Sequence, residues 1–318
     1  MVENKLSLIV PITEDRLSFF FKYANYFMNN LPVKEIVLIG RSTLERSLEN
    51  YSSKYIRFMN EDTLLKGMTF SKIEEYKFRY SGRKRRTGWY FQQFLKMAYS
   101  LACQDEYYLV WDADTIPVNK ISFFEDSKPL LAYRENVIWD EGYGVVLKDL
   151  LPNECLKKHT NKSFIAEHML IKTEIMRSLI NEIEHNSNIP GELFFEKIMS
   201  TIKKKDYDVT GFSEFETYAA YVLNKYPDCY ELRKWNNFRF GRSVLGQDPT
   251  YAQLRWVSER FVTISIEHFD KQWLLFSALL KKDITKLCKF STVYMLFNPI
   301  SQLIYNARML VRSFVRRF

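Results

Sequence analysis

Short apolar runs alternate with amphipathic segments in the first part of the chain. Residues 6–13 (LSLIVPIT) and 35–40 (EIVLIG) predict buried strands, and residues 18–29 (SFFFKYANYFMN) between them predict a helix. Residues 89–102 (WYFQQFLKMAYSLA) predict a longer helix, which leads into a further strand, YYLVW, at 107–111. Strands that alternate with helices are typical of an α/β fold with a mostly parallel, Rossmann-like sheet.

The pattern changes beyond residue 117, where the segments become shorter. Strands are expected at 129–134, 143–147 and 168–172. Helices are expected at 173–184, 193–204 and 215–225. Residues 66–86 are polar, charged and irregular, and predict a loop.

Two aspartates follow the strand at 107–111. Asp112 and Asp114 are separated by one residue, so both carboxylates point to the same side of an extended segment. Open α/β sheets place their ligands at the carboxyl ends of strands. Two neighbouring carboxylates suit a divalent cation, which can bridge the phosphates of a nucleotide. A solvated turn is the alternative, but the position directly after an apolar strand favours a metal and nucleotide site.

The domain organisation follows from these elements. No internal repeat or low-complexity linker interrupts the sequence, so we expect one domain over residues 1–280. Its residues 1–117 would be the nucleotide-binding half and residues 118–280 the half that binds the acceptor substrate. Residues 281–318 would be a separate helical appendage.

The composition agrees with a folded protein of a reducing compartment. The chain is 47% hydrophobic and 16% aromatic, which excludes global disorder. The four cysteines are scattered and form no CxxC pair, which argues against a disulfide framework and a zinc site. The opening MVENKLSLIVPIT lacks the cationic and apolar regions of a signal peptide, so we expect a cytoplasmic protein.

The positive charge is concentrated in the C-terminal segment. Residues 281–318 hold eight Lys and Arg and one acidic residue, within a chain whose net charge is +8. The rest of the chain is therefore close to neutral, and we expect no nucleic-acid binding.

The same tail has the character of a membrane-surface helix. Arg308, Arg312 and Arg316 repeat every four residues and would line one helix face, with several Phe and Tyr residues nearby. The segment is too polar for a transmembrane span. A cationic, aromatic helix suits an anionic membrane surface, so we expect peripheral attachment to the inner face of the cell membrane. A dimer helix or a partner-binding arm is the alternative.

Three motifs resemble those of the metal-dependent GT-A-fold glycosyltransferases, particularly the bacterial enzymes of surface-polysaccharide synthesis. The first is GWYFQQFLKMA (88–98), followed by WDADT (111–115). The second is FSEFETYAAYV (212–222), similar to the acidic helix start that borders the acceptor pocket. The third is IEHFDKQW (266–273), similar to a late His-containing motif that closes the donor site. The resemblance spans roughly residues 5 to 275.

The resemblance implies a GT-A-like fold, a nucleotide-sugar donor, and Mn²⁺ or Mg²⁺ as cofactor. It assigns Asp114 as a direct metal ligand and His268 as a third ligand, and an imidazole ligand would favour Mn²⁺. Asp112 would contact the donor ribose or a metal-bound water. Further donor contacts are implied at the first strand and in the late motif, from Pro11, Thr13 and Lys271. No acidic residue follows the second strand, where the ribose is often held; Gly40 and Arg41 stand there instead.

Basic and amide side chains near the DxD strand are candidate donor-binding residues. Arg83 and Arg86 belong to a cationic cluster just before the helix at 89–102, and guanidinium groups match phosphate oxygens. They would clamp the donor diphosphate or the phosphate of a lipid-linked acceptor, unless the cluster is only a solvated loop. Gln93 and Lys96 are three residues apart and share a helix face, from which Lys96 would approach the donor phosphates.

Acidic residues supply the candidate base. Ser213 and Glu216 fit a helix capping box, which leaves Glu214 as the candidate general base for the acceptor hydroxyl. An inverting transferase needs such a base, whereas a retaining one does not. Glu167 and His168 open a predicted strand and could either reach an acceptor sugar or pack in the core.

These features predict a glycosyltransferase that moves a sugar from a nucleotide sugar to a surface glycan such as capsule, O-antigen or lipooligosaccharide. One rival is a haloacid-dehalogenase-like phosphatase, in which the first Asp of DxDxT is the nucleophile. The sequence lacks two features expected of such a phosphatase, a Gly after the second Asp and a late acidic pair. The other rival is a membrane-associated assembly protein without activity.

Overall fold

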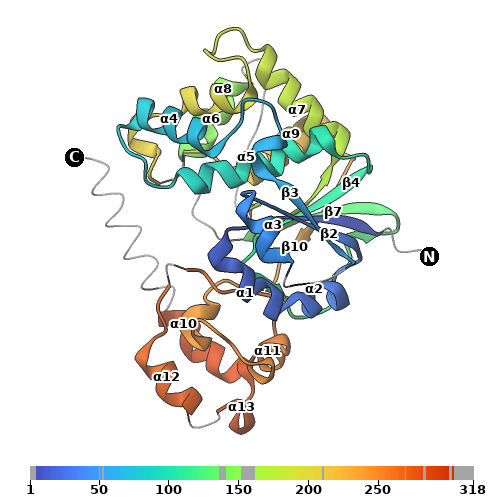
Figure 1. Cartoon of the computed structure of the whole chain (residues 1–318). Coiled ribbons are helices and arrows are strands. Elements are labelled where there is room, and N and C mark those ends of the chain that lie inside the picture. Colours follow the sequence, from blue (N-terminus) through green and yellow to red (C-terminus); the bar gives the residue numbers. More distant parts are fainter. Residues whose placement is uncertain are drawn as a thin grey trace. The chain divides into compact units, whose positions relative to one another are not determined.

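A computed structural model gives the fold of the chain (Figure 1). It describes residues 5–49, 51, 54–135, 141–151, 162–209, 211–268, 270–281, 284–300 and 303. The chain forms two compact units: Met1–Ala113 with Ser122–Trp235, and Asp114–Ile121 with Asn236–Phe318. They are called the first and the second unit below.

The first unit is built on a five-stranded sheet with the order β3-β2-β1-β4-β9. The strands are β1 (Leu6–Pro11), β2 (Val33–Gly40), β3 (Ile56–Asn60), β4 (Tyr107–Trp111) and β9 (His168–Lys172). Four of them are parallel, and β9 runs antiparallel beside β4. The predicted α/β class with a mostly parallel sheet is confirmed. Because the chain moves outward from β1 through β2 and β3 and then returns to the other side of β1, the strand order reverses between β1 and β4.

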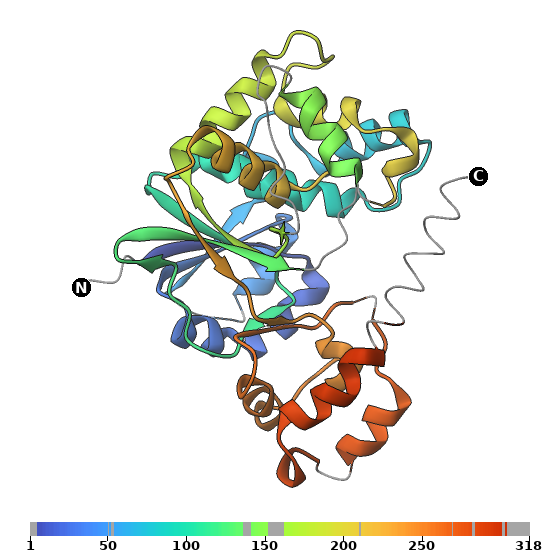
Figure 2. The same cartoon turned by 180° about the vertical axis from the view of Figure 1, so that it is seen from behind.

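Helices cover both faces of this sheet (Figures 1 and 2). On one face lie α1 (Glu14–Lys22), α2 (Ala24–Asn30) and α3 (Thr43–Leu48). On the other lie α4 (Phe70–Ser81), α5 (Thr87–Ala102), α6 (Glu141–Leu150), α7 (Thr173–His185), α8 (Phe194–Thr201) and α9 (Glu214–Lys225). Helix α5 is at the centre of this second layer, and eleven of its 16 residues are buried. Burial all round a helix is expected where it packs against a sheet and further helices together.

Short elements complete the first unit. A small sheet joins β6 (Phe124–Glu125), β7 (Lys128–Glu135), β8 (Lys162–Ser163) and β10 (Glu231–Lys234). Two 3-10 turns, η1 (Glu61–Thr63) and η2 (Lys204–Asp206), follow β3 and precede α9.

The second unit contains a three-stranded sheet and short helices. Its strands are β5 (Thr115–Pro117), β11 (Asn237–Phe238) and β12 (Thr263–Ser265). Its helices are α10 (Gly241–Leu245), α11 (Tyr251–Ser258), α12 (Leu274–Lys281) and α13 (Ile284–Leu287), and residues 290–300 are also helical. The core is aromatic: the ring of Phe238 lies 5.2 Å from that of Phe290 and 5.7 Å from that of Phe297.

The structure divides the chain differently from the predicted boundary after residue 280. Phe290 and Phe297 are 0% and 1% exposed, so the first part of the predicted tail belongs to the core of the second unit. The predicted helix face of Arg308, Arg312 and Arg316 lies outside the described residues. Within the part of the chain that the structure describes, no helix is both long enough and apolar enough to cross a bilayer.

Two secondary-structure predictions are wrong. Residues 143–147, expected as a strand, lie within α6, where Val146, Leu147 and Leu150 are buried at helical spacing. Residues 66–86, expected as a loop, contain α4, which is capped by the Thr69 hydroxyl at its start and by left-handed Gly82 at its end. The helices predicted near 173–184, 193–204 and 215–225 are confirmed as α7, α8 and α9.

Candidate active site

A buried cluster of one lysine and two carboxylates lies at the carboxyl end of β4. The ammonium of Lys96, on α5, lies 2.5 Å from Oδ1 of Asp112 and 2.8 Å from Oε1 of Glu214. The side chains of Lys96 and Glu214 are 2% and 4% exposed, whereas that of Asp112 is 25% exposed. Asp112 is therefore the member of the cluster that solvent or a ligand can reach. Residues 96, 112 and 214 are together called the acid–lysine cluster.

Neighbouring side chains fix the geometry of the acid–lysine cluster. Gln93, one turn before Lys96 on α5, accepts a hydrogen bond from the backbone N–H of Glu214 at 3.1 Å and donates one to the carbonyl of Trp89 at 3.0 Å. The ring of Phe215 lies 4.4 Å from the Lys96 ammonium. The structure thus brings together Gln93, Lys96, Asp112 and Glu214, which the sequence had singled out separately.

The predicted helix start at Ser213 is confirmed. Its hydroxyl accepts a hydrogen bond from the backbone N–H of Glu216 at 3.3 Å, as an N-cap does. The Glu216 carboxylate accepts hydrogen bonds from the Ser163 hydroxyl at 2.7 Å and the Phe164 N–H at 3.0 Å. Glu216 therefore ties α9 to β8, and Glu214 is the acid of this helix start that turns toward Lys96.

Burial and neighbouring charges shift the pKa values of Lys96 and Glu214. Burial alone would lower the pKa of Lys96, but the carboxylates of Asp112 and Glu214 outweigh it and raise that pKa above its usual value. Lys96 is therefore held as a cation. Burial raises the pKa of Glu214, and the charge of Asp112 adds to this effect while Lys96 opposes it. One ammonium thus pairs with two carboxylates, so the cluster has a net negative charge when both acids are ionised.

Glu167 and His168 lie at the start of β9, beside Asp112. The carbonyl of Glu167, a residue with a left-handed φ of 59°, accepts a hydrogen bond from the Asp112 N–H at 2.9 Å. His168 is 2% exposed and lies between Trp111 and Trp235, with ring centroids 4.9 and 4.2 Å away. Burial lowers the pKa of His168 to about 3, so the ring is neutral. The structure gives His168 a packing role at this strand pair and does not present it to an acceptor sugar.

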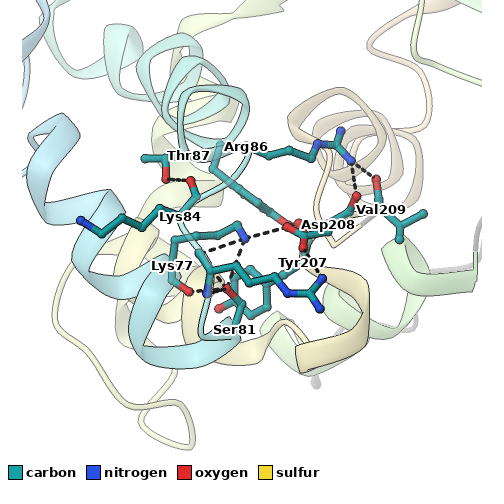
Figure 3. Close-up of polar contacts among 10 residues, drawn as sticks. Lys77, Ser81, Lys84, Arg86, Thr87, Tyr207, Asp208 and Val209 are labelled. Carbon is teal, nitrogen blue, oxygen red and sulfur yellow. Dashed lines mark hydrogen bonds and ion pairs between the residues drawn. The ribbon is translucent and has the colours of Figure 1, made fainter.

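The arginines expected to clamp phosphate are engaged within the protein (Figure 3). Arg83 pairs with the Asp208 carboxylate at 3.1 Å. Arg86 donates to the carbonyls of Asp208 at 3.0 Å and Val209 at 2.6 Å, and its guanidinium lies 4.1 Å from the Trp89 ring. These contacts join the α4–α5 loop to the segment before α9, which is a structural role.

The first strand ends in two predicted donor contacts. Pro11 is buried at the end of β1, and Thr13 is exposed as the N-cap residue of α1. The first turn of α1 carries Glu14 and Asp15. Because these acids already complement the positive end of the helix and repel anions, this helix start is unsuited to a diphosphate.

Asp114, His268 and Lys271 belong to the second unit. The Asp114 carbonyl accepts a hydrogen bond from the Ile266 N–H at 2.8 Å, which places the second Asp of DxD next to the IEHFDKQW segment. His268 and Lys271 are exposed. Among the described residues, no group of three or more His, Cys, Asp or Glu side chains is arranged to hold a metal ion. The set of Asp112, Asp114 and His268 stays a prediction, and Asp112 already has Lys96 as its cation.

Glu61, which directly follows β3 at the same edge of the sheet, was not predicted as a site residue from the sequence. Its side chain is 10% exposed and lies 3.7 Å from Nε of Arg41, the residue after β2. Burial raises the pKa of Glu61 to about 7, with Asp62 adding to the shift and Arg41 opposing it. The polar run Asn60–Asp62 at the end of β3 was the available signal, but a strand at 56–60 was not predicted. Glu61 and Arg41 form a polar pair where the second strand itself offers no acid.

Comparison with known proteins gives distant likenesses in structure. No curated protein matches the sequence. Among the similar solved structures is an active-site mutant of LgtC, at 12% identity and a TM-score of 0.43, covering 87% of this chain and 96% of LgtC. Glycosyltransferase GlyE of Streptococcus pneumoniae TIGR4 is similar at 11% identity and a TM-score of 0.41, covering 93% of this chain. Mouse xyloside xylosyltransferase 1 is similar at 10% identity and a TM-score of 0.37, covering 82% of this chain and 96% of its own. This chain spans only 64% of the length of GlyE.

A family model gives the sequence relationship. It is described as a family of unknown function, DUF6492, and it matches residues 3–235. That range begins just before β1, ends with the first unit at Trp235 and includes the whole acid–lysine cluster. The chain therefore belongs to the DUF6492 family.

Proposed function

We propose that this protein is a glycosyltransferase that moves a sugar from a nucleotide-sugar donor to a glycan acceptor. The observation that carries the proposal is the acid–lysine cluster at the carboxyl end of β4. In open α/β sheets, ligands bind outside the carboxyl ends of the strands, where the strand order reverses. That reversal lies between β1 and β4, so Asp112 stands at the expected ligand position.

The reaction requires one bond to form and one to break at the sugar. The acceptor hydroxyl oxygen bonds to the anomeric carbon, the bond from that carbon to the donor phosphate breaks, and the nucleoside diphosphate leaves. A carboxylate that takes the hydroxyl proton assists this transfer when it is within hydrogen-bond reach. Of the two carboxylates of the acid–lysine cluster, Asp112 is 25% exposed and Glu214 is 4% exposed.

This difference in exposure assigns separate roles. In our proposal Asp112 touches the substrate, as a contact to the donor or as the proton acceptor. Lys96 holds the Asp112 carboxylate in place, Glu214 holds Lys96, and Gln93 holds the backbone of Glu214. Glu214, expected from the sequence as the base, becomes a positioning residue, because its side chain is only 4% exposed and pairs with Lys96.

The finer parts of the proposal come from the sequence motifs. A bound Mn²⁺ or Mg²⁺ ion would neutralise the departing diphosphate, with Asp114 as its ligand. No step assigned to the acid–lysine cluster depends on that ion. We further propose a surface glycan or lipid-linked glycan as acceptor, and a location at the inner face of the membrane.

The proposal is tested by supplying UDP, GDP, CMP and dTDP sugars together with mixed glycan acceptors and measuring the nucleotide released. UDP, GDP and dTDP sugars would release the nucleoside diphosphate, and CMP sugars would release CMP. Asp112→Asn should lower turnover at least ~100-fold, the usual effect of removing one positioned acid–base group, while circular dichroism stays unchanged. Asp149→Asn, at an exposed carboxylate of α6, is the matched control. Full turnover in Asp112→Asn would refute the role of Asp112. Phosphate release from phosphomonoesters, without sugar transfer, would favour the phosphatase instead.

A further inference from the structure

Exposed cations gather where the end of α4 meets η2. They come from two segments about 120 residues apart, and they are Arg79, Arg83, Lys84, Arg85, Lys203, Lys204 and Lys205. We call this set the basic surface. It belongs wholly to the first unit, whereas residues 281–318 are assigned to the second.

The basic surface has a fixed frame (Figure 3). The fully buried Lys77 ammonium pairs with Asp208 at 2.9 Å and donates to the Arg83 carbonyl at 3.3 Å. The Ser81 hydroxyl accepts a hydrogen bond from the Arg83 N–H at 3.1 Å. Asp208 also pairs with Arg83, and Arg86 binds the carbonyls of 208 and 209. The two cationic segments are therefore joined through Lys77 and Asp208.

The positive charge of this surface is only partly balanced. Arg79 pairs with Glu75 and Lys84 with Glu74, both at 2.8 Å, and Arg83 shares Asp208 with Lys77. For the other four side chains, the described residues provide no hydrogen bond or ion pair; these are Arg85, Lys203, Lys204 and Lys205. Cations beside the carboxyl end of α4 stabilise that helix end, which accounts for the cations at residues 79–85. It does not account for Lys203 to Lys205, which lie in and beside η2.

An exposed aromatic ring accompanies the cations. Phe78 is 54% exposed on α4 and directly precedes Arg79 in the chain. Cations around an exposed aromatic side chain suit the interface of an anionic bilayer, where lipid phosphates meet the charges and the ring enters the headgroup layer.

We propose that the basic surface docks the first unit on an anionic lipid bilayer. The contact does not require the tail, and it does not use the acid–lysine cluster. If the protein transfers sugar to a lipid-linked acceptor, as the proposed function holds, this contact keeps the first unit next to its acceptor.

The test is co-sedimentation of the full chain with vesicles of neutral lipid alone, or with added phosphatidylglycerol. The triple variant Lys203→Gln, Lys204→Gln and Lys205→Gln should bind anionic vesicles on the order of 100-fold more weakly, from the usual contribution per lysine at such a surface. The matched control replaces three exposed lysines elsewhere by Gln: Lys5, Lys120 and Lys148. The control should bind as the wild type does, and raised salt should abolish the difference.

Three results would overturn the proposal: unchanged binding of the triple variant, an equal loss in the control, or equal binding of the wild type to neutral vesicles. Preference for a soluble anionic polysaccharide over vesicles would assign the surface to a different partner. Donor turnover in solution separates this proposal from the proposed function. The triple variant should keep it, and its absence from the wild type would refute only the glycosyltransferase.

Discussion

Replacing Lys96 by methionine tests the electrostatics of the acid–lysine cluster. Methionine fills a similar volume but leaves Asp112 and Glu214 without their shared cation, in a site where Glu214 is 4% exposed. Removing one partner of a buried ion pair typically costs about 3–5 kcal/mol. Glu214 can lower this cost by taking up a proton, since burial already raises its pKa. We therefore expect Lys96→Met to lower the free energy of unfolding by about 3 kcal/mol at pH 8, and by less at pH 5.

Urea unfolding at both pH values measures this effect. Lys148→Met, at an exposed lysine of α6, is the control and should change stability by less than about 0.5 kcal/mol. Combining Lys96→Met with Glu214→Leu removes the buried acid together with its cation and should recover part of the loss. If the free energy of unfolding of Lys96→Met is within about 1 kcal/mol of the wild-type value at pH 8, the loss is no larger than that of an ordinary substitution. The cluster would then not be a tightly coupled ion group.

Three further predictions concern other positions. Glu61 has a pKa raised by burial from 4.5 to about 7, so it favours folding in its protonated form, and stability should fall as the pH rises from about 4.5 to 7. Glu61→Gln should remove that slope in urea unfolding, and an unchanged slope would contradict the assignment. His168, with a pKa lowered by burial to about 3, should show no NMR titration between pH 5 and 8; a midpoint near 6.5 would contradict its burial. A Cβ at Gly241 would lie 2.5 Å from the Ser265 carbonyl oxygen, so Gly241→Ala should lower the melting temperature by several degrees. Gly88→Ala, whose Cβ would meet only the Phe70 ring at 3.9 Å, is the control and should melt within a degree or two of the wild type.

The sheet and the long helices were predictable because their signals are local. Continuous apolar runs marked β1, β2 and β4, and the apolar spacing of 89–102 marked α5. Helix α4 was missed because its buried face includes a lysine: Lys77 is 0% exposed and is satisfied by Asp208, 131 residues away in sequence. The β-branched run in 143–147 suggested a strand, but burial of α6 residues at helical spacing overrode that local preference.

The composition of the acid–lysine cluster was predictable, but its pairing was not. Gln93, Lys96, Asp112 and Glu214 were each identified from a motif. The contact between Lys96 and Glu214 spans 118 residues, and a single sequence carries no signal for it. Burial was equally invisible: Glu214 looked like an accessible base, whereas the structure leaves Asp112 as the exposed acid.

The proposed nucleotide-sugar site at the carboxyl end of β4 is best tested by thermal-shift measurement with UDP, GDP, CMP and dTDP sugars, each with and without Mn²⁺. One nucleotide sugar should raise the melting temperature, and Asp112→Asn should lose this shift. A shift that requires Mn²⁺ would add the predicted metal to the site. No shift with any nucleotide sugar, or an equal shift in Asp112→Asn, would show that Asp112 does not mark a nucleotide-sugar site.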